Sequence, residues 1–118
     1  MSQQSHYTIS RDQQTLIFNV CELARFETSD YRKKIENDLH CPEFQDCQNA
    51  IVDCAGLNYA NSLFLESLLY IAADIKRRGG KFCVCGVEPF VHELIQITHL
   101  NQRWPIYANL EEAKAAIQ

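Results

Sequence analysis

Apolar residues in this chain gather in short runs that alternate with amphipathic helical patterns. Residues 7–10 and 15–20 are rich in β-branched and aromatic side chains, and the four polar residues between them suit a hairpin turn. Three further apolar runs occupy residues 50–54, 81–86 and 104–107. Their short length, bounded by polar and turn residues, predicts buried strands.

Four helical patterns separate or follow these runs. In residues 31–39, Tyr31, Ile35 and Leu39 recur every fourth residue, which indicates one apolar helix stripe after capping residues 28–30. Three more helices are expected: residues 62–78, ended by the glycines at 79 and 80; residues 88–99, opened by a proline; and residues 110–117, capped by Asn109.

Strands and helices therefore follow the order ββαβαβαβα, within one domain spanning residues 1–118. This order predicts an α/β fold. We expect a mixed, mostly parallel sheet of about five strands, with an N-terminal antiparallel hairpin, covered by about four helices.

Ser62 falls where a buried strand gives way to a helix. In open parallel sheets, functional sites gather where strand carboxyl ends meet helix N-termini. The Ser62 hydroxyl can cap free backbone N–H groups there, and the same N–H groups and helix dipole favour a bound phosphate. The residues alone also allow Asn61 or Ser62 to be only a helix cap.

The net charge and the hydropathy of the chain argue against nucleic-acid binding and against insertion into a membrane. The net charge of -4, with no Lys/Arg cluster longer than residues 76–78, argues against nucleic-acid binding. No apolar run reaches the roughly 18 residues needed to cross a bilayer, and residues 1–4 are too polar to open a signal peptide. A cytoplasmic protein without membrane insertion is therefore expected.

Motifs for catalysis or metal binding are missing from the sequence. The six cysteines form no C-x-x-C pair, and the four histidines show no i, i+4 spacing, so no metal site is predicted. There is no phosphate-cradling glycine motif and no G-x-S-x-G elbow, so neither an enzyme nor a cofactor is expected. Cys41 and Cys47, in the polar connection 40–48, carry an alternative hypothesis of redox sensing.

Four stretches resemble the STAS domain family, which includes bacterial anti-sigma-factor antagonists and the cytoplasmic tails of sulfate transporters. Residues 20–24 (VCELA) are similar to its "L-x-G-E-L-D" segment, and residues 51–62 (IVDCAGLNYANS) to its "vvlDlsgvtyiDS" run. The other two, similar to its "rGGrlvlvgvsp" and "sleeAl" segments, begin at residues 79 and 110.

The resemblance implies a partner-switching regulator. Ser62 takes the place of the serine that a kinase-type anti-sigma factor phosphorylates, and Asn61 replaces the acid before it. The unphosphorylated form of such a regulator binds that kinase and so releases a sigma factor. A phosphate adds roughly -1.5 to -2 charges, enough to disrupt a packed interface. The partner-binding residues expected on this basis are Glu22, Ala24, Asn58, Tyr59, Asn61, Ser62, Leu63, Phe64 and Glu66.

The chain departs from the family pattern after Ser62. Residues 63–66 read LFLE where the family has small residues, and Glu66 lies one turn from Ser62, where its charge repels a phosphate. A second hypothesis is therefore a scaffold subunit of a transporter or stress-signalling complex, with Leu63 and Phe64 as a partner-binding patch unless both point into the core. A third is a nucleotide or lipid bound at the helix N-terminus.

Overall fold

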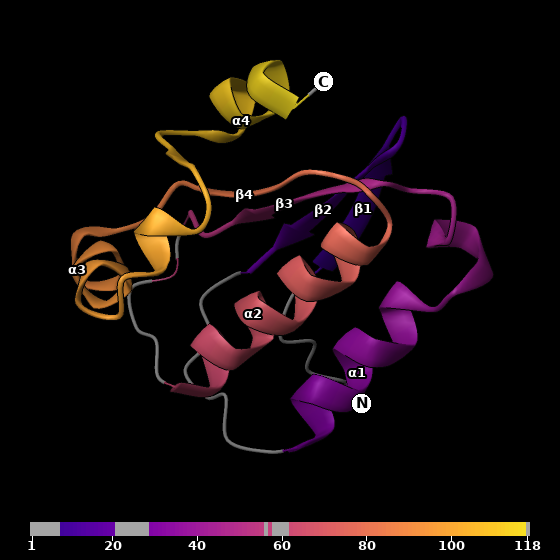
Figure 1. The fold of residues 1–118 in the computed structure, drawn as a ribbon, viewed down its shortest axis with the longest axis horizontal. Coiled ribbons are helices and arrows are strands. Elements are labelled where there is room, and N and C mark those ends of the chain that lie inside the picture. The colour runs from indigo at the N-terminus through magenta and orange to yellow at the C-terminus, as the bar shows by residue number, and fades with distance from the viewer. Residues whose placement is uncertain (1–7, 21–28, 56, 58–61, 118) are drawn as a thin grey trace.

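The computed structural model describes residues 8–20, 29–55, 57 and 62–117. In this part of the chain, five strands form one sheet in the order β1-β2-β3-β4-β5 (Figure 1). β1 and β2 are an antiparallel hairpin, and each later strand runs parallel to its neighbour from β2 onward. The strands are β1 Thr8–Asp12, β2 Thr15–Asn19, β3 Asn49–Asp53, β4 Phe82–Cys85 and β5 Ile106–Tyr107. The predicted mixed α/β sheet is confirmed.

Helices cover both faces of the sheet unequally. α1 and α2 lie on one face, α3 lies at the end of the sheet where the parallel strands finish, and α4 lies on the opposite face (Figure 1). The α-helices are α1 Ser29–Leu39, α2 Ser62–Arg77, α3 Pro89–Ile97 and α4 Leu110–Ile117, with the 3₁₀ helices η1 Pro42–Phe44 and η2 Leu100–Gln102.

The alternation of side chains along each strand divides the core into two parts. Phe18 and Val52 point to the face covered by α1 and α2, where they pack in one cluster with Ile35 and Leu68. On the other face, a smaller cluster joins the strands to α4, with residues Ile51, Cys83, Cys85, Ala113 and Ile117. The larger cluster fixes α2, the helix that begins at Ser62.

The helix boundaries match the capping residues expected from the sequence. At the end of α2, the N–H of Gly80 donates to Ile75 O and that of Gly79 to Lys76 O, which is a Schellman cap. Pro89 occupies the first turn of α3, and Asn109 Oδ1 accepts from the Glu112 N–H at 2.9 Å.

Arg78 fixes the connection between α1 and β3. Its guanidinium donates to the carbonyl oxygens of Leu39 (2.6 Å), Phe44 (2.9 Å) and Cys47 (2.7 Å). It also lies 3.0 Å from Asp74, and both side chains are largely buried. The end of α1, η1 and the following turn are therefore all bound to the last turn of α2.

Candidate functional site

The carboxyl ends of four parallel strands meet at one edge of the sheet. These strands, β2 to β5, end at Asn19, Asp53, Cys85 and Tyr107. α3 lies beyond this edge, and α2 starts on the same side of the molecule (Figure 1). Ser62 and Pro89, which open these two helices, therefore belong to the same side of the domain. We call it the carboxyl edge.

Asp53 anchors the turn that leaves β3. The residue is only 7% exposed, and its Oδ1 accepts a hydrogen bond from the Ala55 N–H at 3.1 Å. The N–H of Cys54 donates to Cys85 O, and that of Leu57 donates to Cys54 O, both at 2.9 Å. Leu57 is itself fully buried. The turn is thus held by hydrogen bonds and by packing before the chain reaches residues 58–61.

Gly86 lies directly against this turn. Its φ of +66° is in the left-handed region that favours glycine. A Cβ at this position meets Asp53 Oδ1 at 2.9 Å and the Ala55 nitrogen at 3.1 Å. The missing side chain lets the turn after β4 contact the turn after β3.

Most of the predicted partner-binding residues lie outside the described part of the chain. This applies to Glu22, Ala24, Asn58, Tyr59 and Asn61. Ser62 and Leu63 open α2 where the sequence predicted its start, while their side chains are not among those described. The roles proposed for these seven residues therefore stay predictions.

The position of Phe64 contradicts its predicted role as a partner-binding residue. Its side chain is 0% exposed and belongs to the main core cluster. Phe64, Leu68, Ile71 and Ile75 recur at intervals of three or four residues and form the buried stripe of α2. Phe64 therefore supports the fold from inside and is wrong as part of an exposed docking patch, whereas Glu66 is exposed.

An exposed apolar side chain on α3 is a candidate that the sequence analysis missed. Phe90 is 52% exposed and lies in the first turn of α3, at the carboxyl edge. Val91 and Ile95 are the buried positions of this helix, so Phe90 points elsewhere. The sequence did contain one indication of an exposed apolar residue: α3 has apolar residues on more than one face, whereas packing against a core requires only one apolar face. Ile97, at the far end of the helix, is 67% exposed.

The buried cysteines Cys47, Cys54, Cys83 and Cys85 act as small apolar residues rather than reactive groups. Burial raises the pKa of the Cys83 and Cys85 thiols to about 12, with a further contribution at Cys85 from the Asp53 charge. Burial likewise raises the pKa of Cys47, which is 0% exposed, and this opposes its redox role. Cys41 is half-buried, and its redox role stays a prediction.

The described part of the chain offers neither a metal site nor a membrane-spanning helix. Within the described ranges, no cluster of three or more His, Cys, Asp or Glu side chains could hold a metal ion. None of the helices in the same ranges is long and apolar enough to span a membrane.

Comparison with known proteins identifies the family. Residues 8–113 match the STAS domain. The chain belongs to the STAS domain family. It is 31% identical over 65 residues to an anti-sigma F factor antagonist of Paenibacillus polymyxa, covering 55% of this chain and 56% of that protein. It is 26% identical over 84 residues to a Bordetella bronchiseptica protein named as an anti-sigma factor antagonist, BtrV, covering 71% and 72% of the two chains.

Solved STAS structures share the fold. A STAS domain protein from Planctomyces limnophilus superposes with a TM-score of 0.79 at 23% identity, covering 94% of this chain and 97% of that one. The Bacillus cell fate determinant SpoIIAA in its phosphorylated form gives 0.70 at 18% identity, covering 95% and 99%. A chain from the stressosome, a signal integration and transduction hub, gives 0.74 at 17% identity, covering 93% and 95%.

Proposed function

We propose that this STAS domain is a regulator of the anti-sigma-factor-antagonist type that docks a protein partner at its carboxyl edge. The observation that carries the proposal is Phe90, a half-exposed aromatic side chain at the edge where Ser62 opens α2. Large apolar side chains surrounded by polar residues are typical anchors of protein interfaces. Similarity to two anti-sigma factor antagonists supports this choice of partner class.

The start of α2 suits a docking site because the described segments on either side of residues 58–61 are held in place. Asp53 and Gly86 fix the turn that precedes it, and the buried stripe of α2 fixes the helix that follows. A preformed surface loses little conformational freedom when a partner binds. The exposed Glu66 and Phe90 then provide one polar and one apolar contact on this side of the domain.

The proposed switch is phosphorylation of Ser62 by a kinase-type anti-sigma factor, which places the protein in transcription regulation in the cytoplasm. A phosphate at this helix start adds two negative charges at most, close to an apolar contact surface. Glu66, one turn later and exposed, adds its own negative charge. Both effects weaken docking, so the phosphorylated form releases the partner.

The test uses the kinase encoded nearest to this gene. We expect incubation with that kinase and ATP to place one phosphate on Ser62, as located by mass spectrometry of peptides. Ser62→Ala should bind the kinase and never be released by ATP. Ser10→Ala, at an exposed serine of β1, is the matched control and should behave as wild type. Binding that ATP never reverses, with Ser62 unmodified, contradicts the switch.

A second experiment tests the docking surface independently of phosphorylation. Phe90→Ala should weaken binding of the kinase at least about tenfold, the loss typical of an interface anchor. Ile97→Ala removes a similarly exposed side chain from the far end of the same helix and should leave binding unchanged. Equal effects of the two substitutions would contradict docking at the carboxyl edge.

A scaffold without phosphorylation is the second candidate function. The exposed Glu66 favours it, because its charge opposes a phosphate on Ser62. In this case the partner is a subunit of a transporter or of a stress-signalling complex such as the stressosome, whose chain shares this fold. The two experiments separate the candidates: a scaffold loses its partner in Phe90→Ala and carries no phosphate on Ser62.

A further inference from the structure

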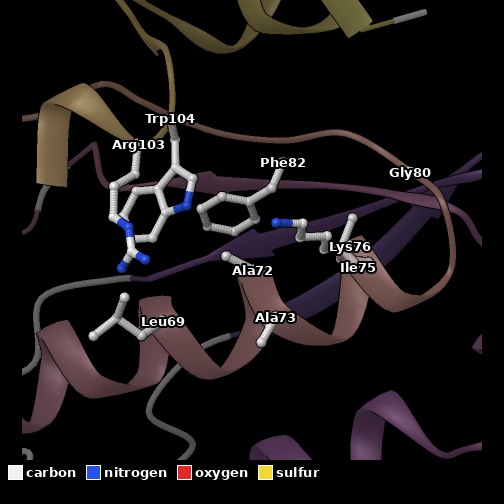
Figure 2. Close-up of a pocket in the computed structure, with 9 residues that line it drawn as sticks. All are labelled: Leu69, Ala72, Ala73, Ile75, Lys76, Gly80, Phe82, Arg103 and Trp104. Atoms are coloured by element: carbon white, nitrogen blue, oxygen red, sulfur yellow. The ribbon is translucent and has the colours of Figure 1, made fainter.

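A groove lies between α2 and the segment that leads into β5 (Figure 2). Its volume is about 650 Å³. This size is within the range of ligand-binding clefts. The groove is lined by Leu69, Ala72, Ala73, Ile75, Lys76, Gly80, Phe82, Arg103 and Trp104.

Apolar side chains form the walls of the groove. The Phe82 and Trp104 rings meet edge to face, with centroids 4.9 Å apart and an interplanar angle of 74°. Phe82 is buried, so it supports the half-buried Trp104 from below. The opposite wall is α2, where Ala72 and Ala73 are too small to fill the space and Leu69 is 37% exposed. An apolar side chain from another molecule fits between these two walls.

The charge of the groove is positive. Lys76 and Arg103 are both exposed, and no acidic residue is among those lining it. Neither cation forms an ion pair with any described residue, whereas the neighbouring Arg77 and Arg78 both pair with Asp74. In a chain with a net charge of -4, this is a local reversal of sign. Such a surface attracts and orients acidic groups.

The arrangement of the two cations around the aromatic pair indicates the shape of the occupant. Figure 2 shows Arg103 beside Trp104, and Lys76 beyond Phe82, so the aromatic pair separates the two charges. From Leu69 to Lys76 the helix rises about 10 Å, the length of about three residues of extended chain. Two separated cations suit carboxylates on either side of an apolar side chain better than one compact phosphate.

We propose that this groove binds a short acidic segment of a protein partner. An apolar side chain of the segment inserts between α2 and Trp104, and its flanking carboxylates pair with Lys76 and Arg103. The groove residues do not belong to the carboxyl edge, so this second contact is independent of the proposed switch. A partner can therefore hold both surfaces, or one partner can remain in the groove while another leaves the edge.

Trp104 provides the assay, because it is the only tryptophan in the chain. The probe is the acetylated pentapeptide amide Asp-Glu-Leu-Asp-Glu, titrated while Trp104 emission is recorded. We expect a saturable change that weakens as salt rises. Two comparison peptides separate the contributions. Asp-Glu-Gly-Asp-Glu keeps the negative charges without the apolar side chain, and Lys-Lys-Leu-Lys-Lys keeps the apolar side chain with the opposite charge. Both should bind at least about tenfold more weakly.

Charge reversal in the protein tests the same contacts. The double substitution Lys76→Glu, Arg103→Glu should weaken peptide binding at least about tenfold. The control is Lys33→Glu, which reverses a charge at an exposed position of α1. It changes the net charge of the protein but not the groove, so the affinity for the peptide should stay near wild type. If the double variant unfolds, Lys76→Gln with Arg103→Gln replaces it, and urea titration of each variant verifies the fold.

Several results would overturn the proposal. These are no saturable response to the acidic peptide, equal binding of the glycine or lysine peptide, or full affinity in the double variant. Saturable binding of ATP or inorganic phosphate at the groove, without binding of the acidic peptide, assigns it to a small anion instead. Association of the protein with itself, measured by sedimentation and abolished by the double variant, assigns it to a second copy. None of these results depends on whether Ser62 is phosphorylated.

Discussion

Gly86→Ala should destabilise the protein far more than Gly79→Ala, although both glycines have a positive φ. The angles are +66° and +80°. A Cβ at Gly79 meets nothing within 4 Å, whereas a Cβ at Gly86 lies 2.9 Å from Asp53 Oδ1 and 3.1 Å from the Ala55 nitrogen. The pair therefore separates the cost of the backbone conformation from the cost of the close contact.

The magnitude follows from two contributions. A left-handed conformation costs an L-residue about 1–2 kcal/mol, and alanine recovers about 0.4–1 kcal/mol by restricting the unfolded chain. Both effects apply equally at the two sites, so Gly79→Ala should cost about 1 kcal/mol. At Gly86 the Asp53 carboxylate must also move and give up the hydrogen bond from Ala55, which contributes about 1.5–3 kcal/mol. The expected total for Gly86→Ala is about 2–4 kcal/mol.

Equilibrium unfolding in urea measures the difference. The midpoint should fall for both variants with an unchanged slope, since neither substitution alters the area exposed on unfolding. Equal losses of stability at the two sites would refute the reasoning, because they would show that the Asp53 turn moves freely. In that case the turn would no longer count as a preformed support for the docking surface.

Three further predictions concern the core, the Arg78 contacts and the buried thiols. Phe64→Ala should lower the free energy of unfolding by about 3–5 kcal/mol, while Phe90→Ala, at a half-exposed side chain, should cost less than about 1 kcal/mol in the same urea titration. Arg78→Met should cost about 3–5 kcal/mol because it removes a largely buried cation from Asp74 and leaves three carbonyl oxygens without their donor, whereas Arg77→Met, at a side chain that is 65% exposed, should cost less than about 1 kcal/mol. Cys85 should resist alkylation by iodoacetamide at pH 8 until urea unfolds the chain. Burial raises the pKa of its thiol in the folded state from the ordinary 9.0 to about 12. The stability that the buried neutral thiol contributes is therefore complete below pH 9 and is lost as the pH rises toward 12.

The element order was predictable because local signals agreed along the chain. Short β-branched runs, the glycines after α2, the proline of α3 and the cap at Asn109 all indicate boundaries through local chemistry. Observed boundaries differ by one or two residues, as at β1, which begins at Thr8 and continues to Asp12 where a turn was expected. At this end of β1 the strand pairing with β2 continues as far as Asp12, which lies opposite Thr15. The local sequence pattern does not show how far two strands pair.

The site was less predictable, because exposure depends on which face of a helix meets the core. Phe64 and Phe90 are both aromatic residues in the first turns of helices that start at the carboxyl edge. Their sequence neighbourhoods do not distinguish them, yet one is 0% and the other 52% exposed. The groove was not predictable either, since Leu69 of α2 and Trp104, which both line it, are 35 positions apart in the sequence.

Packing of α2 against the core explains part of the bulk that follows Ser62. The family pattern has small residues after its serine, and this chain has Leu63, Phe64 and Leu65. Phe64 is directed inward and Leu65 is half-buried, so much of that bulk fills the core under α2 instead of enlarging the surface. Among the described side chains of the carboxyl edge, Phe90 on α3 provides exposed apolar area. For the docking proposed at the carboxyl edge, we therefore expect the partner to have a pocket for the α3 aromatic ring, and a partner shaped only for small residues on α2 should bind poorly.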